Sequence, residues 1–230
     1  MNYALIVAAG NGTRMGNLEV PKQFLVVKNK PLLIYSLESF NNNPSIKGLI
    51  IATSKDYVDQ VKKWCEDYKI NKFIDVVVGG KTRQESVYNG LNKIKEVSND
   101  LENDIVLIHD AARPLVDQEI INNNIEDCLK FDAITTVIPA SDTIIRSKEA
   151  DVINDVPIRK ELYQSQTPQS FKLSLILSAH ESAKQNGLDD ITDDAQLVLK
   201  LGRDVHLVKG NKRNFKITTN DDLAIFKALI

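Results

Sequence analysis

Short runs of apolar residues, rich in isoleucine and valine, recur along the first part of this chain. Each run is too short for a helix and is apolar on both faces, as in the strands of a sheet that is covered on both sides. The runs are Ala4–Ala9, Gly48–Ala52, Ile74–Val78, Ile105–Ile108 and Ile134–Ile138. They predict the buried strands of one sheet.

Amphipathic stretches lie between these runs. Apolar residues recur at helical spacing in residues 31–40, 56–68, 83–97 and 118–130, and this spacing predicts helices with one buried face. Alternation of strands and helices predicts an α/β fold with a doubly wound, mainly parallel sheet. Ligands of such sheets bind where the strands end, so we expect the functional residues directly after the strands.

The pattern changes after Pro139. The next stretch, "ASDTIIRSKEADVINDVPIRKELYQSQTPQSF", alternates short β-rich pieces with charged and turn residues and has no helical spacing. It predicts a protruding antiparallel β-arm at about residues 140–168, which returns to the sheet at "QTPQSF".

The C-terminal part returns to alternating elements. We expect helices at 174–187 and 192–202, strands at 204–210 and 215–219, and a closing helix from Asn220. At the second of these helices, Thr192 is the expected N-cap, with Asp193 and Asp194 favouring the helix dipole. No repeat or linker marks a second unit, so residues 1–230 are expected to form one domain.

Composition excludes several classes of protein. With 29 Lys and Arg against 31 Asp and Glu, the net charge is −2, so no overall field attracts nucleic acid or a membrane surface. Cys65 and Cys128 are too few for a disulfide framework and lack metal-ligand spacing. No stretch approaches the roughly 18 apolar residues of a membrane span, and no export signal is apparent. We expect a cytoplasmic protein without nucleic-acid or membrane partners.

The motif "GNGTRMG" follows the first predicted strand. Gly10, Gly12 and Gly16 let backbone N–H groups approach an anion closely. Arg14 supplies a planar fork of donors for phosphate oxygens, and Lys22 a mobile charge. The spacing matches neither a Walker loop nor the dinucleotide pattern G-x-G-x-x-G. The alternative is a glycine-rich turn with solvated charges. The presence of a second basic residue, Lys22, directly after a proline disfavours this alternative.

The motif "HDAARP" follows the fourth predicted strand. Asp110 stands where a carboxylate usually holds Mg²⁺ against phosphates or accepts hydrogen bonds from hydroxyls. His109 is more commonly a hydrogen-bonded structural residue than a catalyst in such a place. Arg113 either binds phosphate or pairs with a neighbouring acid.

For several other polar residues, the sequence allows either an ordinary structural role or a role in a binding site. In "GGKTRQES", Gly80, Arg83 and Ser86 could contact a base or ribose, or form a turn with a helix cap. Lys216 lies on the face opposite Phe215 and Ile217, where a strand lysine is either solvated or a further phosphate ligand. Three polar residues of the arm are either exposed or part of a site. They are Thr143, Arg159 and Thr167.

Together these motifs resemble a known family. The pattern G-x-G-x-R-M followed by P-K is similar to that of sugar and polyol phosphate nucleotidyltransferases. In the same order, "GGKTRQESV", "HDAARP", "QTPQSF", "TDDA" and "FKITTNDDL" resemble the cytidylyltransferases of 2-C-methyl-D-erythritol 4-phosphate and ribitol 5-phosphate. The resemblance extends from Tyr3 to the last helix. It implies a Rossmann-like nucleotidyltransferase fold, a homodimer formed through the β-arm, and the Mg²⁺-dependent reaction CTP + polyol phosphate → CDP-polyol + pyrophosphate.

The resemblance also implies residue roles. Arg14, Lys22 and Lys216 match the cations that stabilise the reacting phosphates. The matches to CTP-binding positions are Ala8, Ala9, Gly10, Gly12, Gly80, Arg83 and Ser86. The matches to acceptor-binding positions are Asp110, Arg113, Thr143, Arg159 and Thr167, with Asp110 also near the metal. Thr143 and Arg159 would complete the site of a neighbouring subunit.

The motifs divide between two acceptors. "HDAARP", "GGKTRQESVYNGL" and "TDDAQLV" look like the methylerythritol branch of isoprenoid synthesis, whereas "RMGN…PKQF" and "VPIRKELYQSQTPQSF" look like the ribitol branch of teichoic acid or capsule synthesis. We favour methylerythritol 4-phosphate, with ribitol 5-phosphate as the alternative. A non-catalytic nucleotide-binding module is the alternative of another class, and the intact Arg14, Lys22 and Asp110 disfavour it.

Overall fold

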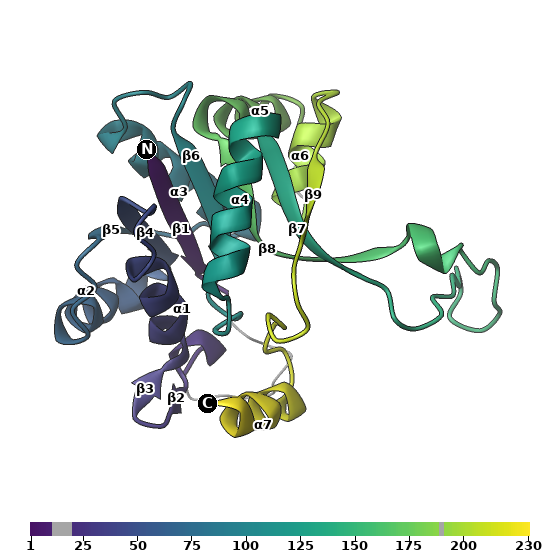
Figure 1. The fold of residues 1–230 in the computed structure, drawn as a ribbon, viewed down its shortest axis with the longest axis horizontal. Coiled ribbons are helices and arrows are strands. Elements are labelled where there is room, and N and C mark those ends of the chain that lie inside the picture. Colours follow the sequence, from purple (N-terminus) through teal and green to yellow (C-terminus); the bar gives the residue numbers. More distant parts are fainter. Residues whose placement is uncertain (11–19, 189–190) are drawn as a thin grey trace.

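The computed structural model describes residues 1–10, 20–188 and 191–230. Within them a seven-stranded sheet has the order β5-β4-β1-β6-β8-β7-β9 (Figure 1). Its strands are β1 Asn2–Ala8, β4 Gly48–Thr53, β5 Phe73–Val78, β6 Ile105–Asp110, β7 Ala133–Pro139, β8 Tyr163–Lys172 and β9 His206–Lys209. Strands β5, β4, β1 and β6 are parallel, and β8 is antiparallel to both of its neighbours, β6 and β7. The predicted mainly parallel sheet is therefore confirmed.

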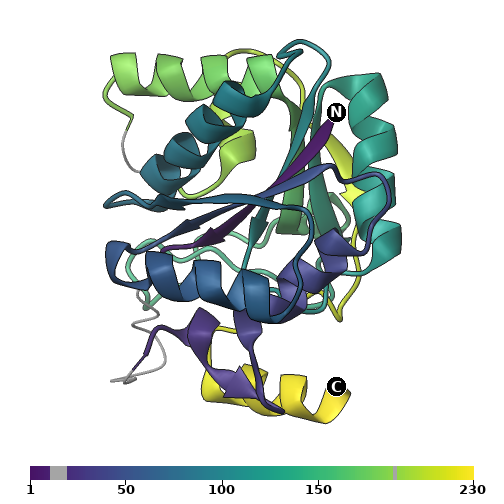
Figure 2. The same ribbon diagram turned by 90° about the vertical axis from the view of Figure 1, so that its left-hand side faces the viewer.

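Helices cover both faces of this sheet (Figure 2). The helices are α1 Leu32–Asn41, α2 Val58–Asp67, α3 Arg83–Val97, α4 Gln118–Phe131, α5 Leu173–Gln185, α6 Asp194–Lys200 and α7 Asn220–Leu229. Apolar residues of α1, α2 and α4 share one core cluster, and those of α3, α5 and α6 share the other. Alternate residues of β1 enter the two clusters, Ile6 the first and Leu5 the second, which explains the run of apolar residues. Strand β5 is only partly buried, because it lies at the edge of the sheet.

The arm leaves the sheet between β7 and β8 and protrudes from the molecule (Figure 1). The two strands pair from Ala133 with Phe171 to Pro139 with Tyr163. Beyond them, residues 140–162 hold one isolated bridge, between Arg146 and Asp155, and a 3₁₀ helix at Arg159–Glu161. The predicted excursion is confirmed, but it is less regular than a β-arm. Residues 163–168 belong to the sheet itself.

Two local predictions near the C-terminus are wrong. Residues 215–219 form no strand, because they cross the carboxyl end of the sheet and bond to a loop, with the amide of Ile217 donating to Ala112 O at 2.8 Å. The N-cap of α6 is Asp193 rather than Thr192, since the Asp193 carboxylate accepts from the amide of Ala195. Helix α7 begins at Asn220 as expected.

Two antiparallel pieces, β2 Val26–Val27 and β3 Lys30–Pro31, form a small separate sheet beside α7. A small apolar cluster of Val27, Leu32, Ile217 and Phe226 lies between them and α7. It holds residues 215–219 against the N-terminal part of the chain. Among the described residues, no helix has the length and apolar character needed to cross a membrane.

Candidate active site

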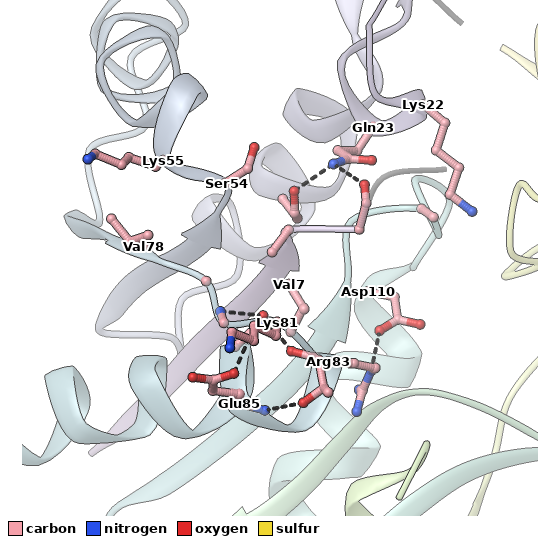
Figure 3. A pocket seen from close by; sticks show the side chains of 18 of the residues that line it. Val7, Lys22, Gln23, Ser54, Lys55, Val78, Lys81, Arg83, Glu85 and Asp110 are labelled. Carbon is pink, nitrogen blue, oxygen red and sulfur yellow. Dashed lines mark hydrogen bonds and ion pairs between the residues drawn. The ribbon is translucent and has the colours of Figure 1, made fainter. Parts of the chain in front are cut away.

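A cavity of about 680 Å³ opens where β1, β5 and β6 end (Figure 3). This is the edge at which ligands of parallel sheets bind. The structure brings many of the predicted site residues together here. Those that line the cavity are Ala8, Ala9, Gly10, Lys22, Gly80, Arg83, Ser86, Asp110 and Lys216. Arg14 and Gly12 lie outside the described residues, so their predicted roles stay predictions.

Gln23 shapes the end of β1. Its side-chain amide donates to Ala8 O at 2.6 Å and to Gly10 O at 2.9 Å, and the residue is buried. The amide therefore fixes the carbonyl groups where the chain leaves the strand (Figure 3). The sequence analysis missed this residue, although it lies in the quoted "PKQF" motif, because an isolated glutamine carries no pattern.

The loop after β5 forms another wall. The Gly80 amide donates to Ser86 Oγ at 3.0 Å, and that hydroxyl donates to Thr82 O at 2.8 Å. Thr82 also caps α3, accepting from the amide of Glu85. A side chain at Gly79 would place its Cβ 2.5 Å from Cβ of Ala9, so glycine permits this loop to approach β1. The turn with a helix cap is thus present, and the same loop lines the cavity.

Asp110 is the centre of the site's charge. Lys216 Nζ donates to its Oδ2 at 2.6 Å, and Arg83 Nε donates to its Oδ1 at 3.1 Å. Burial alone would raise the pKa of Asp110, but Arg83 and Lys216 hold that pKa well below its usual range. The carboxylate is therefore ionised at any physiological pH.

Lys22 lies on the same rim as Lys216. Its ammonium donates to Ile217 O at 2.8 Å, one residue beyond Lys216. Figure 3 shows Lys22 and Asp110 on one side of the cavity, with Lys55 on the other. Two cations from opposite ends of the chain therefore line one cavity, and one of them, Lys216, pairs with Asp110. Cations grouped in this way suit the binding of phosphates.

A second cavity, of about 440 Å³, lies at the base of the arm and shares Lys216 with the first. Arg113 also lines it. Its terminal nitrogens donate to two carbonyl groups, Asn214 O at 2.8 Å and Ser165 O at 3.2 Å. In the structure Arg113 thus bonds to backbone carbonyls, because the segment before Lys216 crosses over it, and its charge also acts on Asp110. Its predicted role in binding the acceptor stays a prediction.

Two further residues of interest lie beneath Asp110. Thr167 is buried, and its hydroxyl accepts from the amide of Asp110 at 3.1 Å. His109 is fully buried, with Nε2 3.0 Å from Arg113 O and Nδ1 3.2 Å from the Thr167 hydroxyl. Burial lowers the pKa of His109 to about 4, so the ring is neutral. These contacts support the structural interpretation of His109, and they place Thr167 behind the site rather than in it.

The arm residues lie apart from both cavities. Thr143 and Arg159 are exposed, and Arg159 donates to Ser141 O at 3.3 Å. Neither residue is among those lining the two cavities described above. Within one copy of the chain they are therefore not brought to the site.

Asp194 is a second residue that the sequence analysis missed. It is 2% exposed, and its Oδ2 accepts from Arg83 at 2.6 Å, behind the wall of the first cavity. From the sequence alone, Asp194 is expected only to favour the dipole of its helix. Its place in the quoted "TDDA" motif was the available signal, but nothing in the pattern indicates that its partner is an arginine more than a hundred residues away.

Asp110 is also the residue best placed to hold a metal ion. Proteins usually bind Mg²⁺ through one or two carboxylates together with substrate phosphates, rather than in an all-protein cage. Over residues 1–10, 20–188 and 191–230, no group of three or more His, Cys, Asp or Glu side chains could hold a metal. An ionised Asp110 facing a cavity with two lysines fits the first arrangement.

This chain is similar over its whole length to known cytidylyltransferases. The family model for 2-C-methyl-D-erythritol 4-phosphate cytidylyltransferase (IspD) matches residues 2–230. A ribitol-5-phosphate cytidylyltransferase of Lactiplantibacillus plantarum is 38% identical over 100% of this chain and 98% of its own. One from Vibrio parahaemolyticus is 42% identical over 100% of this chain and 96% of its own. The crystal structure of the Francisella tularensis 2-C-methyl-D-erythritol 4-phosphate cytidylyltransferase (IspD) matches with a TM-score of 0.84 at 30% identity, covering 100% of this chain and 99% of that chain.

Proposed function

Because the chain belongs to the 2-C-methyl-D-erythritol 4-phosphate cytidylyltransferase (IspD) family and is thus a cytidylyltransferase, we propose that its acceptor is D-ribitol 5-phosphate. The sequence motifs slightly favoured methylerythritol 4-phosphate, so the order of the two acceptors is reversed here. The proposal rests on sequence identity: two ribitol-5-phosphate cytidylyltransferases that match over their whole length are 38% and 42% identical, against 30% for the solved methylerythritol phosphate enzyme of Francisella tularensis. The products are CDP-ribitol and pyrophosphate.

The described residues support a direct transfer. An oxygen of the acceptor phosphate attacks the α-phosphorus of CTP, and the bond to pyrophosphate breaks on the opposite side. The protein needs no covalent intermediate, since its task is to position the two anions and to stabilise the charge that develops. Lys22 and Lys216 lie on one rim of the cavity and are the described cations we assign to this charge, with Arg14 as the predicted third.

Backbone groups at the two glycine-containing loops are assigned to CTP. Ala8 ends β1 and Ala9 and Gly10 follow it, while Gly80 and Ser86 line another wall of the same cavity. Gln23 and Thr82 fix the positions of backbone and hydroxyl groups in these loops. Such groups suit the recognition of a pyrimidine, because they lose little conformational entropy when the ligand binds.

Asp110 is assigned to Mg²⁺ and to the hydroxyls of the acceptor. A divalent cation bound with the triphosphate would supply further neutralisation of the reacting phosphates. In the structure Lys216 occupies one oxygen of Asp110. When Lys216 turns to a substrate phosphate, that oxygen becomes available.

The arm is assigned to a second copy of the chain. Its exposed surface carries branched apolar side chains, each more than 40% exposed. They are Ile144, Ile145, Val152, Ile153, Val156 and Ile158. Exposed apolar groups so concentrated usually mark a protein interface. A homodimer that buries them would also bring Thr143 and Arg159 to a neighbouring site.

The test compares kcat/KM for D-ribitol 5-phosphate and 2-C-methyl-D-erythritol 4-phosphate, each with saturating CTP and Mg²⁺. We expect ribitol phosphate to be preferred by at least tenfold. A preference for methylerythritol phosphate would overturn the acceptor assignment and leave the transfer reaction intact. If neither acceptor supported the release of pyrophosphate, both the acceptor assignment and the transfer reaction would be contradicted.

A further inference from the structure

A row of paired charges, buried at Asp194 and Asp110 and partly exposed at Arg83 and Lys216, connects α6 with the cavity. Arg83 NH1 donates to Oδ2 of Asp194 at 2.6 Å, while its Nε donates to Oδ1 of Asp110 at 3.1 Å. Lys216 then donates to Oδ2 of Asp110 at 2.6 Å. One guanidinium therefore bridges two carboxylates. Asp110, Arg83 and Lys216 line the cavity, whereas Asp194 lies behind it.

Asp194 is ionised although it is buried. Burial would raise its pKa, but the charge of Arg83 and the contact with His180 hold that pKa below its usual value. Its second oxygen lies 3.3 Å from Nε2 of His180 on α5, which is also 2% exposed. The carboxylate is thus flanked by partners on both sides. An unpaired charge in such a place is strongly destabilising, so Asp194 and Arg83 depend on each other.

The four charged groups of this row have no net charge. Asp194 and Asp110 carry two negative charges, and Arg83 and Lys216 carry two positive ones. If Lys216 turned to a substrate phosphate, the other three groups would together keep one negative charge; the charge of Arg113, which is not one of the four, also lowers the pKa of Asp110. Without the charge of Asp194, Arg83 alone would neutralise Asp110.

We propose that Asp194 is a positioning residue of the reaction: by holding Arg83 at NH1, it directs Nε to one oxygen of Asp110 and leaves the other oxygen for Lys216 and the substrates. The guanidinium is a rigid planar fork, so fixing one nitrogen fixes the direction of the others. Asp194 touches no substrate itself. The inference rests on the transfer reaction proposed above but not on the choice of acceptor.

A purely structural role is the competing account, since Asp194 also ties α6 to α3. That role would lower stability and leave the kinetics of the folded enzyme unchanged. A double-mutant cycle on kcat/KM distinguishes the positioning role from the structural one. When two residues act through one contact, the loss of kcat/KM in the double variant is smaller than the product of the two single losses.

The experiment compares D194N, R83Q and the double variant, each assayed with CTP and whichever polyol phosphate the unaltered enzyme prefers. We expect D194N to lower kcat/KM at least tenfold at unchanged folded fraction, and D194N in the R83Q background to cause less than a twofold further loss. Asp194→Glu, which keeps the charge, should recover part of the activity. The matched control is D193N. In the unaltered chain the Asp193 carboxylate accepts from Gln169 and Ser165 rather than from Arg83. Any loss of kcat/KM in D193N should therefore multiply with the loss in R83Q.

Two results would overturn the proposal. One is a kcat/KM of D194N within twofold of the unaltered enzyme, and the other is a double variant whose loss equals the product of the single losses. If D194N does not fold, R83Q alone is compared with R83Q/D194N, in which the unpaired buried charge is absent. Equal kcat/KM of these two variants is required by the proposal, and a further fall contradicts it. Asp194→Glu, which keeps the charge but moves the carboxylate, then separates the accounts: a kcat/KM lowered severalfold at unchanged folded fraction supports the proposal, and a value within twofold of the unaltered enzyme supports the structural role.

Discussion

The cavity and the arm are opposite in construction. Around Asp110, Arg83 and Lys216 are partly buried and pair with its carboxylate, and even the walls of the cavity are fixed by hydrogen bonds that involve Gln23 and Thr82. Residues 140–162 instead expose apolar side chains and hold one isolated bridge. The cavity is built within one chain, whereas the arm presents a surface that one chain leaves uncovered. We infer that the cavity sets the reaction and that the arm contributes to choosing the acceptor.

The largest expected effect is at the cavity. Lys22→Ala should lower kcat by on the order of a hundredfold or more, because a cation opposite the developing phosphate charge stabilises mainly the transition state. Steady-state pyrophosphate release measures it. Lys55→Ala, across the cavity, is the matched control and should retain kcat within about threefold. Near-normal turnover of Lys22→Ala would remove this lysine from the mechanism.

Disrupting the arm should come next. The double substitution Ile153→Lys and Val156→Lys puts two charges on an exposed apolar surface, so folding of the monomer should be unaffected while self-association is lost. Light scattering coupled to size-exclusion chromatography should report a dimer for the unaltered protein and a monomer for the variant. Activity should fall about tenfold or more if the arm completes a neighbouring site. A dimer that persists in the variant would show that the interface lies elsewhere.

The next effect concerns the rigidity beneath Asp110. Burial lowers the pKa of His109 to about 4 from its ordinary 6.5, so the unfolded chain binds a proton there more readily than the folded one. Stability should therefore be fully present above pH 6.5 and decrease as the pH falls toward 4, by up to about 3 kcal/mol from this group. Urea unfolding of His109→Gln should show a weaker dependence on pH in that window. The exposed His206→Gln is the control, and an identical dependence in both variants would contradict the assignment.

The smallest effect is expected within the arm. Arg146 and Asp155 approach to 3.5 Å, and both side chains are about half exposed. Exposed ion pairs contribute little, so Asp155→Ala should change the free energy of unfolding by less than about 0.5 kcal/mol in urea titrations. A loss several times larger would mean that the arm has a stable structure of its own.

Much of the fold could be predicted because its signals are local. The apolar runs gave β1, β4, β5, β6 and β7 to within a few residues, since two-sided burial leaves a repeated trace in the sequence. The segment 215–219 resembled a strand by alternation alone. It forms none, because a strand also needs a neighbouring strand with free hydrogen-bonding groups, which the sequence does not display.

The site was predicted less completely. Glycine loops and the acid at a strand end have recognisable positions, and the structure places Gly80, Asp110 and Lys216 around one cavity. Asp194 and Gln23 were missed because their partners are distant or are backbone carbonyls. Such contacts depend on tertiary packing, and one sequence carries no record of them.

One measurement tests most directly whether the arm contributes to binding the acceptor while the cavity binds CTP. Arg159, exposed on the arm, is replaced by alanine, and KM is determined separately for CTP and for D-ribitol 5-phosphate. Our account predicts that the acceptor KM rises at least tenfold while the KM for CTP stays within twofold of its original value. An unchanged acceptor KM, or an increase confined to CTP, would contradict it.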